Sequence, residues 1–177
     1  MIASIADPVS RFAGDESDYP FVLHPYLTAT FFDGRGANLP WLQEMPDPMT
    51  SVVYGSWVEL NPVTADELGI REGDVLDVES PAGSVRVPAL IFPAIRPGVV
   101  AIPVGQGHAA YGRYARDRGV NPIHIVATLI DDQSGDLAWA ATRVKLKLTG
   151  ERLQIIKTDG VTRTLGRQIL GPENDHA

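Results

Sequence analysis

The residues best suited to hold a ligand form a glycine-rich loop after an apolar run. The run VVAIPV (99–104) is followed by Gly-Gln-Gly-His at 105–108. Glycines let a backbone approach a ligand closely, and successive amides can bind an anion. Three arginines follow in an otherwise acidic chain: Arg113, Arg116 and Arg118. This pattern fits a phosphate or pyrophosphate site, and it equally fits a tight turn followed by a solvated basic surface.

A helix start lies just beyond these arginines. Asn121 can accept a hydrogen bond as an N-cap, and Pro122 suits the first helical position. The spacing of four apolar residues predicts that this helix has an apolar face: Ile123, Val126, Ala127 and Ile130. A ligand role of the Asn121 amide is a second interpretation beside the cap.

Composition excludes several kinds of site and partner. The chain has 177 residues, no cysteine and a net charge of -7. Iron–sulfur ligation, disulfides and a cysteine nucleophile are therefore excluded on this chain, and a nucleic-acid partner is not expected. The four histidines are dispersed, so we expect no metal site. No apolar run is long enough to span a bilayer directly, and the first residues do not read as a signal peptide.

A self-processing enzyme is a separate alternative. The pairs Gly55-Ser56 and Gly83-Ser84 could in principle yield a pyruvoyl group, although Gly83-Ser84 is expected at a hairpin tip in any case. The carboxylates between 66 and 77 show no spacing that demands acid–base chemistry. The sequence therefore predicts no catalytic residue.

Short strands must position the glycine-rich loop. Alternating or apolar runs predict strands at 21–27, 56–61, 74–80, 84–90, 99–104, 143–149 and 153–157, with a closing hairpin to 161–165. Thr64 and Glu67 fit a capping box before a helix that ends at Gly69. Pro25 predicts an edge or strand end, and 28–48 is expected to be irregular. We predict a mostly β fold with short helices, closed or nearly closed into a barrel.

The expected organisation has four parts. Residues 1–20 form a flexible lead-in, and 21–55 form a wrapping segment of the barrel domain. Residues 56–170 form the barrel, and 171–177 form a frayed tail.

Three landmarks in order resemble a known family. They are NPVTADELGIREGDVLDVESPAGSVRV, PGVVAIPVGQGH and GVNP. They resemble the C-terminal molybdopterin-dinucleotide-binding domain of the DMSO-reductase superfamily. The segment FFDGRGANLPWLQEMPDPMTSVVYGSW and the form GQGHAAYGRYARDRGVNP are most similar to the polysulfide and tetrathionate reductase branch, with the molybdopterin-type subunit of alternative complex III.

This resemblance implies a double-psi β-barrel that contacts a molybdopterin guanine dinucleotide. The implied cofactor-binding residues are Gly105, Gln106, Gly107, His108, Tyr111, Gly112, Asn121, Gly34, Arg35 and Arg113. The family's metal ligand and cluster cysteines lie in other domains, so no iron–sulfur cluster and no metal ligand are expected on this chain.

The resemblance implies a domain or split subunit of a membrane-associated iron–sulfur/molybdopterin oxidoreductase that is not catalytic alone. The expected partners are the remaining domains or subunits, including iron–sulfur and membrane-anchor subunits. The expected location is peripheral to the membrane, on the periplasmic face. The alternative is a cofactor-free structural domain of a quinol-oxidising alternative complex III, in which the cofactor has been lost.

Overall fold

Six strands form a closed ring in the computed structural model, which describes residues 11–132 and 134–158. They are β1 (Phe21–Tyr26), β3 (Val58–Leu60), β4 (Asp74–Ser80), β5 (Gly83–Ile91), β6 (Val99–Pro103) and β7 (Arg143–Arg152). Their order around the ring is β1-β6-β3-β5-β4-β7. A separate two-stranded sheet pairs β2 (Val52–Val53) with β8 (Ile156–Lys157).

The ring mixes two parallel pairs with antiparallel ones. β1 runs parallel to β6, and β3 runs parallel to β5. The other contacts, β1–β7, β3–β6, β4–β5 and β4–β7, are antiparallel. The predicted mostly β fold with short helices is confirmed.

Every strand of the ring contributes side chains to one buried core. The alternation of strand side chains sends every second residue inward. The fully or almost fully buried contributors are Leu23, Val58, Leu60, Leu76, Val78, Val87, Ala89, Val100, Ile102 and Val144. Removal of this apolar area from water is the main stabilising contribution to the ring.

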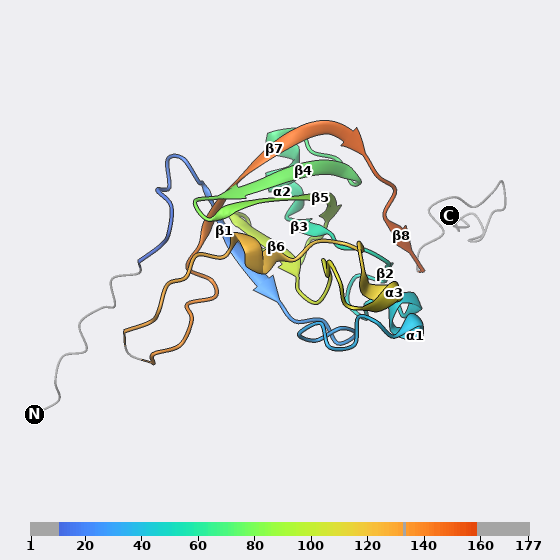
Figure 1. Cartoon of the computed structure of the whole chain (residues 1–177). Helices are drawn as coiled ribbons and strands as arrows, with labels where there is room; N and C mark the ends of the chain where they lie inside the picture. Colours follow the sequence, from blue (N-terminus) through green and yellow to red (C-terminus); the bar gives the residue numbers. More distant parts are fainter. Residues whose placement is uncertain (1–10, 133, 159–177) are drawn as a thin grey trace, which may run out of the picture.

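The helices are short, and two of them contribute a buried residue to the core, Ala65 and Ile125. They are α1 (Pro40–Glu44), α2 (Pro62–Leu68), α3 (Gly112–Ala115) and the 3₁₀ turn η1 (Pro122–Ile125). Figure 1 shows α1, α3 and β2 gathered at one end of the molecule, away from the arc of β7. Within the described residues, no helix has the length and apolar content needed to cross a membrane.

The start of α2 differs from the predicted capping box. Asn61, not Thr64, is the N-cap, and its side chain accepts from the Val63 amide at 2.9 Å. Pro62 then takes the first helical turn, where its missing N–H costs nothing. The prediction overlooked this Asn-Pro start, although Asn121-Pro122 has the same form. The predicted end at Gly69 is confirmed, with a left-handed φ of 67°.

Three other local predictions need correction. The segment 28–48 is not wholly irregular, because it contains α1. The helix after Asn121 stops after one 3₁₀ turn at Ile125, and Ile130 is exposed rather than on a continuing apolar face. β3 is shorter than the predicted 56–61. The partner hairpin strand 161–165 and the 171–177 tail lie outside the described residues.

β1 is not an edge strand along its whole length. Phe21 and Val22 pair with β7, while Val22 to Tyr26 pair with β6. Pro25 lies beyond the β7 pairing, so its missing N–H interrupts no ladder on that side.

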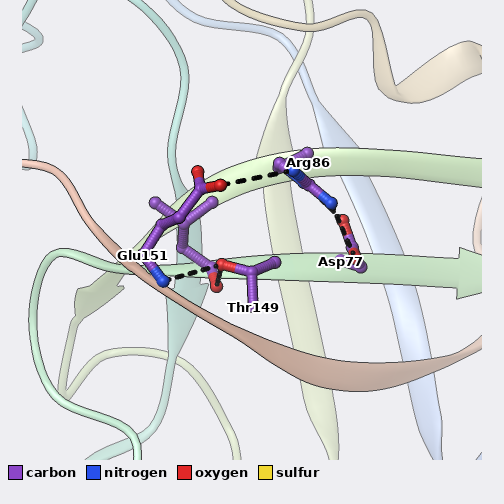
Figure 2. Close-up of polar contacts among 5 residues, drawn as sticks. Asp77, Arg86, Thr149 and Glu151 are labelled. Carbon is purple, nitrogen blue, oxygen red and sulfur yellow. Dashed lines mark hydrogen bonds and ion pairs between the residues drawn. The ribbon is translucent and has the colours of Figure 1, made fainter.

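The outer side of β4, β5 and β7 carries a ladder of opposite charges, which we call the ladder face. Arg86 Nε donates to Asp77 at 2.8 Å, and Glu151 lies 3.7 Å from the same guanidinium. Figure 2 shows Arg86 between these two carboxylates. Lys145 pairs with Glu79 at 3.0 Å in the same way. The strand register places Asp77 directly opposite Arg86, and Glu79 directly opposite Lys145.

Candidate functional site

The loop after β1 and the loop after β6 meet beside the end of β6. The Tyr111 hydroxyl donates to the Arg35 carbonyl at 3.0 Å. The Asn38 side chain accepts from the Tyr114 amide at 3.0 Å. Segments about 75 residues apart in the sequence therefore form one surface. We call the surface formed by residues 27–55 and 105–121 the loop face.

The close approach of the two loops requires a glycine at position 105. Gly105 has a left-handed φ of 107°, and an added Cβ would lie 2.7 Å from the Phe31 Cβ. Gly34 is the counterpart in the first loop, with φ of 99° and a virtual Cβ 2.9 Å from His108 Nε2. Both glycines thus allow the two loops to approach each other, whatever else the loops bind.

Gly107 packs against the residues that start η1. Its φ is 85°, and an added Cβ would lie 2.3 Å from the Asn121 nitrogen. The Gly107 amide donates to the Arg118 carbonyl at 2.7 Å. This N–H is therefore already used inside the protein. The predicted anion-binding role of the loop must rest on its other groups.

Asn121 acts as the cap of η1, as the sequence predicts. Its Oδ1 accepts from the Ile123 amide at 3.1 Å. Gly112, at the start of α3, lies as close to a neighbour as Gly107 does: an added Cβ would lie 2.3 Å from the Asn38 Nδ2 atom.

Gln106 is buried and joins the glycine-rich loop to α1. Its Nε2 donates to Gln43 Oε1 at 2.9 Å, and Gln43 Nε2 donates back at 3.2 Å. Gln43 Nε2 also donates to the Ala37 carbonyl at 2.7 Å. The side chain predicted to touch a ligand is thus engaged in an amide pair with the wrapping segment.

His108 has a buried nitrogen that the protein leaves unpaired. Among the described residues, its Nε2 has no hydrogen-bond partner. The ring lies 5.0 Å from the ring of Tyr111, tilted by 39°. A buried polar atom without a partner is uncommon and marks a position where a ligand or a water could bind.

The arginines of the loop face differ in their partners. Arg35 is held by Asp33 through contacts of 2.9 and 2.6 Å. This contact lowers the pKa of Asp33 to about 2, although both side chains are exposed. Arg116 lies 3.8 Å from Asp117. Arg113 stacks on the Tyr114 ring at 4.7 Å, and no ion pair of Arg113 is found among the described residues.

A buried carboxyl group lies beneath the wrapping segment. Glu59, only 4% exposed, accepts from the Tyr26 hydroxyl at 2.5 Å and from Trp57 Nε1 at 3.0 Å. Burial raises the pKa of Glu59, and the two donors oppose this shift without cancelling it. Burial, with the adjacent carboxyl, raises the pKa of Tyr26. Sequence reasoning did not single out Glu59, because an acidic residue in a strand is seldom buried.

Two hollows flank the loop face. A groove of about 340 Å³ runs between the β2–β8 sheet and β5, and its lining is mostly apolar. A second cavity of about 10 Å³ lies under Thr30 and Asp47. Of the ten predicted cofactor-binding residues, Gln106 is the one that lines either of these two hollows.

Ser56 and Asn38 connect the loops but were not predicted to do so. The Ser56 hydroxyl accepts from the Val120 amide at 3.0 Å and donates to the Val120 carbonyl at 3.3 Å. This bridge gives Ser56 a structural role. The local sequence contains no signal for either contact, because each partner lies more than 60 residues away.

Comparison with known proteins identifies relatives of this chain. The molybdopterin-containing polypeptide ArrA of the arsenate respiratory reductase of Shewanella sp. (strain ANA-3) is 39% identical over 111 residues, or 62% of this chain and 13% of that protein. A tetrathionate reductase polypeptide of Archaeoglobus fulgidus is 35% identical over 96 residues, or 54% and 8%. The molybdopterin-binding-like subunit of the menaquinone reductase of Nitratidesulfovibrio vulgaris is 31% identical over 90 residues, or 51% and 13%. The chain therefore spans only about a tenth of the length of these relatives.

A solved structure and a family model also match this chain. Acetylene hydratase from Pelobacter acetylenicus matches 74% of this chain and 18% of its own, with a TM-score of 0.58 and 20% identity, which shows a shared fold. The model of the molydopterin dinucleotide binding domain matches residues 40–139, which is more than half of the 177 residues. The chain belongs to the molydopterin dinucleotide binding domain family.

Proposed function

We propose that this chain is the molybdopterin-dinucleotide-binding domain, or a split subunit, of a larger iron–sulfur/molybdopterin oxidoreductase. The observation that carries the proposal is the junction of the two loops, within a chain whose family is established. Residues 34–35 and 105–121 come from distant parts of the sequence and share one surface. The proposed fold is a double-psi β-barrel, and the two parallel strand pairs in an otherwise antiparallel ring support it.

The residues of the junction fit an anionic, aromatic group. His108 offers a buried nitrogen without a protein partner among the described residues, and Tyr111 offers an exposed ring beside it. Arg113 supplies a positive charge in an acidic chain. These three side chains would hold the dinucleotide, with Gly34, Gly105, Gly107 and Gly112 shaping the loops that carry them. Gln106, Asn121 and Arg35 would act by fixing loop positions, because their side chains already bind within the protein.

When bound, a molybdopterin dinucleotide supplies the redox chemistry, and this chain contributes binding and orientation. No group of three metal-ligating side chains is found in the part of the chain that the structure describes. The iron–sulfur clusters, which need cysteine, belong in this proposal to other domains or subunits, because this chain has none. We place the complete protein at the membrane, peripheral and on the periplasmic face, with a separate membrane-anchor subunit.

A cofactor-free structural domain of an alternative complex III is the second candidate. Two observations favour it. The space beside Gly105, Gly107 and Gly112 is filled by the protein's own atoms, so these glycines are explained without a ligand. One relative is described as molybdopterin-binding-like. In this alternative, the loop junction serves only to hold the wrapping segment on the ring.

The test compares two arginine variants of the assembled enzyme. Arg113→Ala should lower the bound pterin, measured by fluorescence after oxidative release, by about tenfold or more, because loss of a charged hydrogen bond costs about 1.5–3 kcal/mol. Arg152→Ala in β7, whose guanidinium donates to the Glu72 carbonyl, should retain the wild-type pterin content. Equal pterin content in both variants would contradict the role of Arg113. An intact wild-type assembly that contains no pterin would establish the structural role instead.

The isolated chain provides a further check. Purified alone, it should reduce no redox dye in the presence of candidate substrates, because it has neither cysteine nor a described cluster of metal ligands. Substrate-dependent dye reduction by the pure 177-residue protein would contradict the proposed division of labour.

A further inference from the structure

The small cavity under the wrapping segment contains an unexplained polar group. Thr30 is 8% exposed, and its Oγ1 atom has no hydrogen-bond partner among the described residues. Thr30 also lines the cavity of about 10 Å³. Leaving a buried hydroxyl unpaired costs about 1–3 kcal/mol, so such groups normally have a partner.

The other walls of this cavity are partly polar. Asp47 lines it and is 6% exposed. Asp47 Oδ2 accepts from the Met49 amide, the Thr50 amide and the Thr50 hydroxyl, so these three bonds all end on one oxygen. Thr28 also lines the cavity, and its Oγ1 accepts from the Phe31 amide, which leaves its hydroxyl proton available to donate.

The size of the cavity fits one small guest. A single water molecule needs a cavity of about 10–15 Å³ and two to four polar partners. Buried Trp57 and Val104 line it on one side, and the exposed side chains of Met45 and Tyr54 also line it, so it is not fully enclosed. A larger ligand does not fit, and an empty space of this polarity is unfavourable.

We propose that this cavity binds one ordered water molecule, held by the Thr30 hydroxyl, the Thr28 hydroxyl and the Asp47 carboxylate. The water connects two parts of the wrapping segment, the turn after β1 and the turn before β2. Gln106 lines the same cavity, so the water also lies against the start of the glycine-rich loop. It thereby fixes the floor on which that loop rests, with or without a cofactor above it.

The distinguishing experiment uses two substitutions of Thr30 in the 177-residue chain. Thr30→Val keeps the side-chain volume and removes the hydroxyl, whereas Thr30→Ser keeps the hydroxyl. If the water is bound, Thr30→Val should lower Tm by about 2–4 °C, because the water loses a partner. If the cavity is dry, Thr30→Val should leave Tm unchanged or raise it, because the substitution removes an unpaired buried hydroxyl.

Crystal structures at a resolution that shows ordered water give the second readout. The wild type and Thr30→Ser should both show density for one water within hydrogen-bond distance of residue 30 and Asp47, and Thr30→Val should show none. A wild-type cavity without density, or a Thr30→Val variant at least as stable as the wild type, would overturn the proposal. Because neither readout involves pterin, failure here is distinguishable from failure of the proposed cofactor role.

Discussion

The ladder face and the loop face present opposite kinds of surface to their surroundings. On the ladder face, paired charges such as Arg86 and Asp77 cover the strands. The loop face instead exposes large apolar side chains: Leu27, Phe32, Leu39, Trp41, Met45, Met49, Tyr54 and Tyr111. Exposed apolar side chains concentrated on one region are typical of contact with further protein. Under the proposed function, the loop face would be the one directed to the rest of the larger protein, and the ladder face would be directed to water.

The two faces also differ in what holds them together. The strands under the ladder face are joined by regular backbone pairing, which tolerates many side chains. The loop face depends on glycines that leave space for another backbone and on single side-chain bridges such as Ser56 to Val120. Single substitutions should therefore cost more on the loop face than on the ladder face.

The largest expected effect contrasts two glycines with similar φ. Gly107→Ala should lower the free energy of unfolding by about 2–4 kcal/mol, because a Cβ meets the Asn121 backbone and the left-handed φ is strained. Gly150→Ala in β7, with φ of 83° and open space, should cost only the strain, about 1 kcal/mol. Urea denaturation of both variants measures the difference. Equal losses of unfolding free energy in the two variants would show that the backbone at the loop junction shifts readily to accept a Cβ. The two faces would then not differ in their tolerance of substitution.

A smaller loss is expected at the buried amide pair. Gln106→Met keeps a long side chain but leaves Gln43 Oε1 without its donor, so we expect a loss of about 1–3 kcal/mol. The double substitution Gln43→Met, Gln106→Met removes both partners and should recover part of that loss, although the Ala37 carbonyl then loses its bond. Denaturation of the single and double variants gives the coupling energy. Strictly additive losses would show that the two amides do not interact.

A pH-dependent effect is expected at Glu59, between the ring and the wrapping segment. The pKa of Glu59 is raised above its ordinary value of 4.5 in the folded chain. The raised pKa means that the folded chain binds the Glu59 proton more tightly than the unfolded chain does. This proton binding stabilises the folded chain fully below about pH 4.5, and the stabilisation is lost as the pH rises through the folded pKa. Glu59→Gln does not titrate, so Tm of the variant minus Tm of the wild type should increase from pH 4 to pH 7. Each unit of raised pKa corresponds to about 1.4 kcal/mol.

Thermal unfolding of both proteins across this pH range measures that difference directly. The depressed pKa values of Asp33 and Asp77 affect both proteins equally and cancel in the comparison. A difference that stays flat, or that falls with rising pH, would show that burial does not raise the pKa of Glu59.

The ladder face was largely predictable from sequence, whereas the loop face was not. Alternation in 74–80 and 143–149 predicts two strands, of which β4 spans the predicted 74–80 and β7 begins at the predicted residue but continues to Arg152. The periodicity works there because each side chain faces either the core or water. Alternation does not predict the environment of Glu59, whose side chain is 4% exposed and accepts hydrogen bonds from Tyr26 and Trp57.

In the loop face, the residues could be named from sequence but not placed. The glycines at 105 and 107 signal close approach, but the sequence does not say whether the neighbour is a ligand or the protein's own backbone. The structure identifies Phe31 and Asn121 as those neighbours. Bridges such as Asn38 to Tyr114 depend on contacts between distant segments, which local sequence patterns do not encode.

The smallest expected effect tests whether the ladder face is as tolerant as its exposure suggests. Arg86 and Asp77 lie directly opposite each other across β5 and β4, and Glu151 of β7 lies near the same guanidinium (Figure 2). A double-mutant cycle of Arg86→Gln and Asp77→Asn should give a coupling energy of about 0.2–1 kcal/mol, because exposed ion pairs are weakened by water and by side-chain entropy. Moving from about 0.05 M to about 1 M salt should reduce this coupling, since the Debye length falls to about 3 Å. A salt-insensitive coupling above about 2 kcal/mol would mean that the ion pair is shielded from water. The ladder face would then be part of a buried contact, as is proposed for the loop face.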